Sequence, residues 1–285
     1  MGAWDAWIGR AETRTDRIDE GLVARWLATF DRDAPFDGTL PQGIQWCLCL
    51  PDAPTAQLGT DGHPVRDNSQ ESFLPPVPLP RRMWAASKVD FGAPLKTGEV
   101  VSRTSQIQSI NEKSGASGQL VFVDVAHETV GESGLAIREV QSIVYRAAAG
   151  ADVPLTPLAP TGEGFDAAVW DAHHVITPNT PLLFRFSALT FNSHRIHYDL
   201  PYAQDEERYR GLVVHGPLMA TLLLDLARQQ FGDNALASFA FRGLSPAICE
   251  EPLHLAMRIS GVEIELGAFA NDGRHIMTAS ARKKV

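Results

Sequence analysis

The sequence has few of the features that mark secreted or membrane-spanning proteins. It has only three cysteines, Cys47, Cys49 and Cys249, which cannot all pair and show no Cys-x-x-Cys spacing, so we expect reduced, buried thiols. The longest apolar run, 218–226, contains Asp225 and is far shorter than the roughly 20 residues that cross a bilayer. The first residues, MGAWDAWIGRAE, lack the apolar core of a secretory signal. We therefore expect a cytoplasmic protein with no membrane partner.

Positive charge is also scarce. Lysine and arginine total 25 against 34 aspartates and glutamates, which gives a net charge of -9 and a pI near 5.5. Nucleic-acid binders usually need clustered lysine and arginine, so this balance argues against a nucleic-acid partner. An anionic small molecule would need a local basic pocket.

The 285 residues are 44% hydrophobic, enough to bury a real core. This length fits two units of about 140 residues each. The segment Ala147–Gly164 is rich in Ala, Pro and Gly and has no periodicity, as is typical of a linker. We therefore predict an N-terminal domain at 1–146, a linker at 147–164 and a C-terminal domain at 165–285.

Both halves show the same order of elements. Apolar residues at four-residue spacing predict a helix over 14–31, and the Pro- and Gly-rich stretch 51–80 predicts a long loop. Alternating residues then predict strands at 84–91, 100–110, 120–129 and 136–146. The second half repeats this with an apolar helix at 217–231 and strands at 238–243, 253–259, 262–270 and 275–283. The pattern favours an α+β fold in which an antiparallel sheet wraps around a long helix, twice.

The densest polar cluster is the segment 190–199, TFNSHRIHYD. His194, His197 and Asp199 could bind zinc or iron, but their spacing is not that of a known metal motif and no second ligand set is evident. The alternative is acid–base chemistry, with a histidine that titrates near neutral pH. A solvated loop remains a third interpretation. We predict acid–base chemistry and no metal.

Two long motifs carry a resemblance to a known family. FSALTFNSHRIHYDLPYA followed by YRGLVVHGPLMATLLLDLA resembles the motif of MaoC-like enoyl-CoA hydratases. In that family a loop of the form Asp-x-Asn-Pro-x-His-x-Asp precedes a His-Gly at the start of the hot-dog helix. The N-terminal sequences LGTDGHP, FLPPVPLPRRMWA, KSGASGQLVFV and IVYR resemble one branch of it. That branch holds mesaconyl-C4-CoA hydratases, itaconyl-CoA hydratases and type 2 hydroxyacyl-thioester dehydratases.

The resemblance implies a double hot-dog fold, with two antiparallel sheets that each wrap around a central helix. It also implies a degenerate N-terminal hot dog that shapes the acyl pocket and a C-terminal hot dog that holds the catalytic residues. His197 falls on the family's catalytic histidine. Gly216 falls on the glycine whose N–H binds the thioester carbonyl, which suits a free N–H at a helix N-terminus.

One position departs from the family pattern. Asn192 stands where the family has its catalytic aspartate, and an amide can hold a water but cannot act as a base at neutral pH. His197 would then carry the proton transfer, with help from Asp199 or His194. Asn192 could instead only cap a turn.

The remaining candidates are predicted to bind substrate. Arg195 could pair with Asp199 to order the loop, or it could clamp the free carboxylate of a dicarboxylic acyl group. His194, Asp199 and His215 are placed with it around the acyl group. Arg81 and Arg82 could reach the phosphates of CoA or form a solvated pair.

We therefore predict a carbon–oxygen lyase that adds water reversibly to the α,β double bond of an enoyl-CoA. The expected substrate is mesaconyl-C4-CoA or itaconyl-CoA. A 3-hydroxyacyl-thioester dehydratase of fatty acyl chains is the alternative. Alternatives of a different functional class are a hot-dog thioesterase and a non-catalytic acyl-CoA-binding protein. No cofactor is needed, and hot-dog units normally pair their sheets, so a homodimer or higher homo-oligomer is expected.

Overall fold

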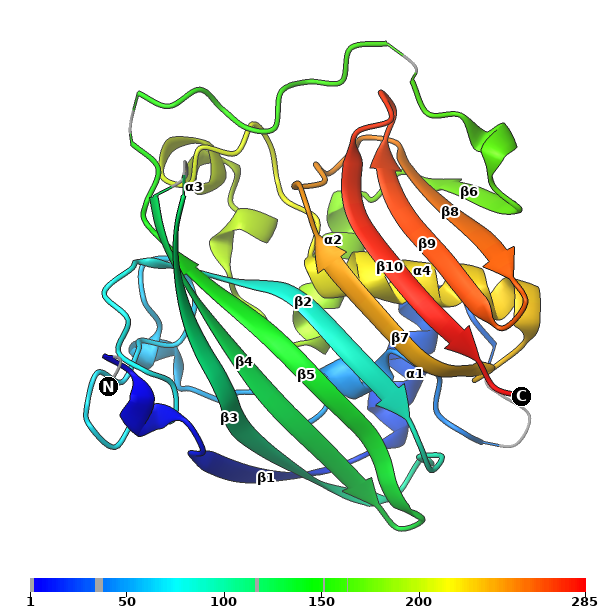
Figure 1. The fold of residues 1–285 in the computed structure, drawn as a ribbon, viewed down its shortest axis with the longest axis horizontal. Coiled ribbons are helices and arrows are strands. Elements are labelled where there is room, and N and C mark those ends of the chain that lie inside the picture. Colours follow the sequence, from blue (N-terminus) through cyan, green and yellow to red (C-terminus); the bar gives the residue numbers. More distant parts are fainter. Residues whose placement is uncertain (1–2, 34–37, 116–117, 151, 163) are drawn as a thin grey trace.

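The computed structural model describes residues 3–33, 38–115, 118–150, 152–162 and 164–285. Its centre is a ten-stranded antiparallel sheet in the order β1-β3-β4-β5-β2-β7-β10-β9-β8-β6 (Figure 1). The strands are β1 (Ala11–Arg17), β2 (Arg81–Phe91), β3 (Val100–Gly115), β4 (Gly118–Gly131), β5 (Gly134–Arg146), β6 (Ala172–Ile176), β7 (Leu236–Gly243), β8 (Leu253–Ser260), β9 (Glu263–Ala270) and β10 (His275–Lys283). The α-helices are α1 (Glu20–Thr29), α2 (Thr180–Leu189), α3 (Leu200–Asp205) and α4 (Gly216–Phe231), and the short 3₁₀ helices include η2 (Ile44–Cys47), η3 (Thr55–Gln57) and η5 (Arg195–His197).

The sheet consists of two five-stranded parts joined edge to edge. Strands β1 to β5 precede residue 147, strands β6 to β10 follow residue 164, and the pairing of β2 with β7 joins them. We had expected two separate sheets. Without this pairing, β2 and β7 would each leave a row of backbone N–H and C=O groups without partners. All eight predicted strands are present, and the proposed domain boundaries at 146 and 165 stay a prediction.

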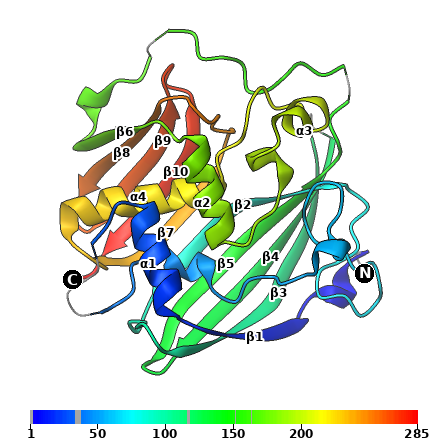
Figure 2. The same ribbon diagram turned by 180° about the vertical axis from the view of Figure 1, so that it is seen from behind.

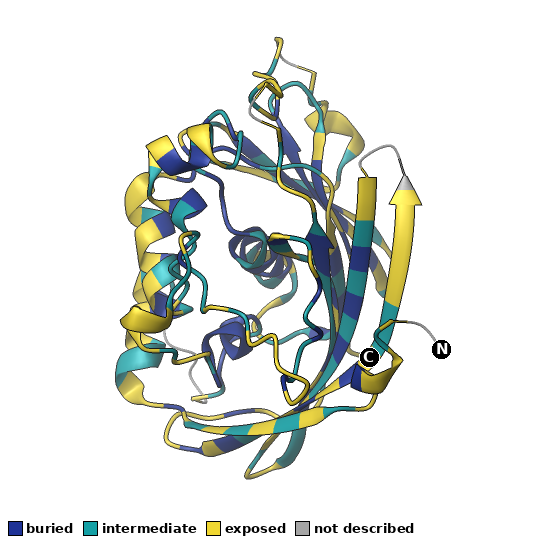
Figure 3. Cartoon of the chain, turned by 90° about the vertical axis from the view of Figure 1, so that its left-hand side faces the viewer, coloured by how far each residue is buried: buried dark blue, intermediate teal, exposed yellow. Residues whose placement is uncertain are grey.

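The predicted helix at 217–231 is confirmed as α4. It packs against β6, β8, β9 and β10, and Figure 3, which looks along this helix, shows it dark blue inside the curve of the sheet. Leu218 and Leu223 are fully buried. Pro217 follows the first residue of the helix, and Gly232 ends it with a positive φ of 90°. Burial of nearly every face of α4 explains why its sequence is apolar all round.

The N-terminal half departs from the expectation of a second central helix. The predicted helix at 14–31 is wrong in its first part, because 11–17 form the edge strand β1, whose burial alternates along the chain. Helix α1 starts only after Asp19, whose carboxylate accepts the N–H of Leu22, and it packs beside α2 (Figure 2).

The short turn η2 is buried against strands of both halves instead. Its Trp46 packs edge-on against Trp84 of β2 and Phe241 of β7. All three cysteines are free and buried, as predicted.

The predicted long loop between residues 51 and 80 is confirmed. It contains only the turn η3 and an isolated bridge between Leu58 and Pro64. Phe73, Leu74, Val77 and Leu79 of this loop pack on a small core from β3, β4 and β5. The loop therefore covers the sheet face of the N-terminal half. Among the described residues, no helix is long and apolar enough to span a membrane.

Candidate active site

The predicted polar cluster lies between the end of α2 and the start of α4. Helix α2 ends at Leu189, Phe191 takes a left-handed conformation with φ of 47°, and the chain then forms η5 and α3. The next segment leads into the N-terminus of α4. This path brings residues 192–199 against the start of the central helix, as the motif predicts.

His197 is buried and held by two contacts. Its Nδ1 lies 2.7 Å from the carbonyl oxygen of Val213, so that nitrogen donates and Nε2 keeps its lone pair. Its ring stacks on that of His215, with centroids 3.5 Å apart. Burial, together with the charge of the neighbouring His194, lowers the pKa of His197 to about 3. The ring is therefore a neutral proton acceptor at physiological pH.

His215 lies behind His197 as a supporting side chain. It is the residue before α4, it is 2% exposed, and its Nε2 lies 2.8 Å from the hydroxyl oxygen of Ser187 on α2. Burial lowers its pKa well below the usual value. Its Nδ1 is buried with no hydrogen-bond partner among the described residues. The stacked pair fixes the plane of His197, so the contacts of His215 are those of a positioning residue, and the predicted contact with substrate stays a prediction.

Gly216 is the first residue of α4. An N–H at this position has no partner within the helix, and among the described residues no other acceptor is bonded to it. A Cβ at Gly216 would lie 3.9 Å from the carbonyl oxygen of Trp84 on β2. Gly216 therefore lies close to β2, near the junction of the two sheet parts, and the helix dipole adds positive potential at its N–H.

Asn192 makes the turn-capping contact that we had held as the alternative. Its Oδ1 accepts the backbone N–H of His194 at 3.0 Å, and its own N–H donates to Ser187 O at 2.9 Å. The side-chain oxygen has a second lone pair and the amide nitrogen remains available.

Arg195 shows the loop-ordering contact. Its Nε and one terminal nitrogen donate to Asp199 Oδ2 at 2.9 and 2.7 Å, and the other terminal nitrogen donates to Thr60 O at 2.8 Å. The guanidinium also lies 4.2 Å from the ring centroid of Tyr202. The hydrogen bond from Arg195 lowers the pKa of Asp199. These contacts favour the ordering role over a carboxylate clamp, and they leave Asp199 a poor metal ligand.

The two arginines of β2 differ. Arg81 is buried and its Nε lies 2.8 Å from a carboxylate oxygen of Glu207, with a further bond to Glu206 O. That pairing argues against a role in binding phosphate. Arg82, in contrast, lies within ion-pair distance of no carboxylate among the described residues.

Sequence reasoning missed one wall of the site, the segment 60–63 of the long loop. The backbone N–H of Arg195 donates to Asp61 O at 2.9 Å, and the hydroxyl of Ser193 donates to Gly62 O at 2.5 Å. A Cβ on Gly62 would lie only 1.9 Å from Ser193 O, and its φ is 87°. The loop thus docks backbone to backbone on the predicted cluster. The sequence LGTDGHP carried this signal, but the resemblance gave it no role.

This wall brings a carboxylate to the histidines. His63 Nδ1 lies 3.1 Å from Asp61 Oδ2, and the His63 ring lies 4.2 Å from that of His194. Hydrogen bonds and the charge of His63 outweigh desolvation and lower the pKa of Asp61 to about 2. The pKa of His194 is lowered to about 3, mainly by burial and to a lesser extent by the charge of His63.

The ligand atoms of Asp61, His63 and His194 lie within 4.8 Å of one another, the spacing of a possible metal site. The two oxygens of Asp61, however, already accept the Nδ1–H and the backbone N–H of His63. The arrangement is that of a hydrogen-bonded carboxylate–imidazole pair.

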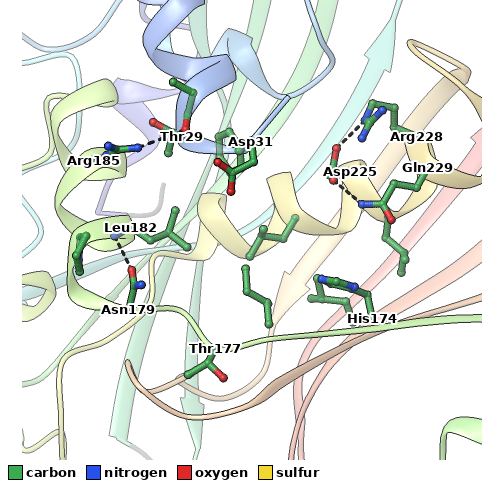
Figure 4. Close-up of a pocket in the computed structure, with 17 residues that line it drawn as sticks. Thr29, Asp31, His174, Thr177, Asn179, Leu182, Arg185, Asp225, Arg228 and Gln229 are labelled. Carbon is green, nitrogen blue, oxygen red and sulfur yellow. Dashed lines mark hydrogen bonds and ion pairs between the residues drawn. The ribbon is translucent and has the colours of Figure 1, made fainter. Parts of the chain in front are cut away.

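A separate cavity of about 540 Å³ opens between α1, α2, α4 and β6. Figure 4 shows that it is lined by polar side chains such as Arg185, Asp225 and Arg228. It contains none of the candidate catalytic residues. The site is therefore assigned from the histidine cluster at the other end of α4.

Comparison with known proteins identifies the family. The family described as hydroxyacyl-thioester dehydratase type 2 matches residues 43–249. The chain is also 43% identical to the mesaconyl-C(4)-CoA hydratase of Chloroflexus aurantiacus over 280 residues, which covers 97% of this chain and 96% of the relative. The chain belongs to the type 2 hydroxyacyl-thioester dehydratase family. This membership confirms the predicted enzyme class, a hydratase or dehydratase.

Solved structures support the fold of this family member. A MaoC-like dehydratase matches with a TM-score of 0.74 and 15% identity over 99% of both chains. A Mycobacterium tuberculosis protein with a double hot-dog fold matches with a TM-score of 0.54 and 13% identity over 97% and 96%. The predicted α+β double hot-dog fold is confirmed.

Proposed function

We propose that this dehydratase-family member adds water reversibly to the α,β double bond of an enoyl-CoA with a C5-dicarboxylic acyl group, such as mesaconyl-C4-CoA or itaconyl-CoA. The observation that carries the proposal is the juxtaposition of a neutral, oriented His197 with the free N–H of Gly216. The substrate class is supported by the similarity to mesaconyl-C(4)-CoA hydratase.

The reaction has two steps, addition of water to the β-carbon and protonation of the α-carbon. His197 Nε2 takes a proton from water, and the water oxygen bonds to the β-carbon. The π electrons of the double bond move into the thioester, where the Gly216 N–H and the α4 dipole stabilise the enolate oxygen. The proton then returns to the α-carbon, so that the elements of water are added and the histidine is neutral again.

We propose that Asp61 and His63 supply the carboxylate function that Asn192 lacks. The carboxylate of Asp61 orients His63 through Nδ1, which leaves Nε2 free next to His194. An imidazole backed by a carboxylate can hold the attacking water and share its proton. Asn192 then keeps the turn in shape and presents its amide to the same water.

A direct assay separates this function from its rivals. A hydratase consumes the enoyl chromophore of mesaconyl-C4-CoA without releasing thiol, whereas a thioesterase releases CoA and a non-catalytic binder does neither. A dehydratase of fatty acyl chains would act on crotonyl-CoA and longer homologues better than on mesaconyl-C4-CoA. Thiol release without loss of the double bond would overturn the proposal.

We further propose that the protein acts in the cytoplasm as a homodimer or a higher homo-oligomer and needs neither a metal nor a redox cofactor. Light scattering of the purified protein gives the oligomeric state. If no metal is needed, the protein should keep its full activity after treatment with a chelator.

A further inference from the structure

One arginine near the candidate active site has no carboxylate partner. Arg66, Arg81, Arg82 and Arg146 gather at one end of β2 and β5, in a chain of net charge -9. Three of them are engaged. Arg81 pairs with Glu207, Arg66 donates to Val77 O and Pro80 O, and Arg146 donates to Tyr209 OH at 3.0 Å. Among the described residues, Arg82 pairs with no carboxylate, and its interaction is with the hydroxyl of Tyr145.

The position of Arg82 on β2 puts it on the same strand face as Trp84. On β2 it precedes Trp84 by two residues, so both side chains lie on the same face of the strand. The carbonyl of Trp84 is the group that approaches Gly216. Two strand residues span roughly 7 Å, which an arginine side chain can reach across. The charge of Arg82 also contributes to the lowered pKa of His194, so the guanidinium lies on the side of the histidine cluster.

A buried hydroxyl lies next to this guanidinium. Tyr145 on β5 is directly opposite Arg82 in the strand register, and it is fully buried. Its hydroxyl makes no full hydrogen bond with the described residues, but it interacts with the guanidinium of Arg82. Burial raises the pKa of Tyr145, and the charges of Arg82 and Arg66 and the interaction with Arg82 oppose that rise. A buried hydroxyl with an incomplete hydrogen bond beside a guanidinium is a place where a ligand oxygen can bind.

We infer that Arg82 and Tyr145 form a binding site for the free carboxylate of the acyl group. This inference rests on the proposed function. With the thioester carbonyl at Gly216 N–H, the free carboxylate of a C5-dicarboxylic acyl group lies only a few carbon–carbon bonds away, on the side of β2. The guanidinium binds the two carboxylate oxygens as a fork, and the tyrosine hydroxyl donates to one of them.

This assignment replaces two earlier predictions. Arg195, predicted as a possible carboxylate clamp, is already bonded to Asp199 and Thr60. Arg82, predicted to reach the phosphates of CoA, belongs instead to the specificity of the acyl pocket. The two roles of Arg82 differ in what they recognise, because every acyl-CoA has the phosphates but only some have the carboxylate.

The test measures kcat/KM for mesaconyl-C4-CoA and crotonyl-CoA in the wild type and in Arg82→Gln. The ratio of the two values is expected to fall about ten- to a hundredfold, the range of a charge-assisted hydrogen bond. Tyr145→Phe should lower the same ratio by a smaller factor. Arg195→Gln is the matched control, since it removes a charge in the same site and should slow both substrates alike. Equal losses for both substrates in Arg82→Gln would overturn the inference and assign Arg82 to the CoA moiety.

A binding measurement separates the subsite from the chemistry. Succinyl-CoA and butyryl-CoA have no double bond to hydrate and differ mainly in the free carboxylate. Calorimetry should show tighter binding of succinyl-CoA to the wild type, and Arg82→Gln should abolish most of that difference. If no hydration is observed with any substrate, the proposed function fails while this difference still tests the subsite. Equal affinities in the wild type would overturn it.

Discussion

The two halves of the molecule contain the same number of strands, but different elements cover the inner face of the sheet in each half. Helix α4 lies inside the curve of the C-terminal strands, whereas the N-terminal strands are covered by η2 and by the loop between residues 51 and 80. The helix provides a free N–H at Gly216 and a rigid support for His215. The loop provides only backbone carbonyls and the pair Asp61–His63. In the proposed mechanism the C-terminal half therefore provides His197 and Gly216, and the N-terminal half adds the pair Asp61–His63 from a loop that forms one wall of the site.

The loop segment 60–63 packs closely against residues 193–195 of the site. Two of the docking contacts, from Arg195 N–H to Asp61 O and from the Ser193 hydroxyl to Gly62 O, involve backbone or near-backbone atoms. A third runs from the guanidinium of Arg195 to Thr60 O. The two halves are therefore expected to respond differently to substitution, sharply at the helix N-terminus and at Gly62, and weakly elsewhere along the loop.

The largest effect is expected at His197 in the C-terminal half. His197→Ala should lower kcat for enoyl-CoA hydration by about 10²–10⁴-fold, the usual contribution of a general base. The melting temperature checks that the fold survives, and His275→Ala, which changes a histidine outside the cluster, serves as a control. A variant that keeps more than half of the wild-type rate would remove His197 from the mechanism.

The next effect tests whether the N-terminal loop takes part in the chemistry. His63→Gly should lose about 10²-fold in rate, and added imidazole should restore part of the loss, because it can occupy the same space and share the same proton. A residue that only supports the fold would not be rescued in this way. Asp61→Asn should shift the pH–rate profile of the remaining activity, since it removes the carboxylate that orients His63. A profile identical to that of the wild type would exclude Asp61 from a positioning role.

A smaller effect is expected from the docking of the loop itself. Gly62 and Gly9 both have a φ of 87°, but a Cβ at Gly62 would meet Ser193 O, whereas nothing lies within 4 Å of one at Gly9. Both alanine variants should lose about 1–2 kcal/mol of stability from backbone strain. Only Gly62→Ala should also lose activity, by about tenfold or more, because the loop must move away from the site. Equal activity in the two variants would show that the docked position of the loop is not needed.

The sequence predicted the elements whose pattern is local. The apolar helix 217–231 and the eight strands follow from periodicity, and His197 and Gly216 follow from a motif that spans a single stretch of chain. Three features depended on distant contacts instead. Part of strand β1 was predicted as helix because the strand has no apolar alternation of its own and directly precedes the apolar spacing that begins at Ile18. The joining of the sheets and the docking of Gly62 on Ser193 depend on residues more than a hundred positions apart, which no local pattern reveals.

The smallest effect concerns stability at low pH. It compares the buried histidines of the two halves. His194 and His197 lie in the C-terminal half with pKa values lowered to about 3, and His215 lies beside them with its pKa also lowered. The N-terminal half has His127, whose pKa burial lowers to about 4. Each of these histidines binds a proton near pH 6.5 in the unfolded chain but stays neutral in the folded one. The unfolded state therefore binds more protons as the pH falls below 6.5, and the free energy of unfolding decreases.

Each such histidine contributes about 1.4 kcal/mol per pH unit to this slope, from pH 6.5 down to its pKa in the folded protein. Urea unfolding between pH 7.5 and 5.5 measures it. His127→Gln and His215→Gln should each reduce the slope by about one proton, but only His215→Gln should also slow hydration, because its ring supports His197. A slope unchanged by both substitutions would mean that folding does not lower the pKa values of His127 and His215, which would contradict this account of acid stability.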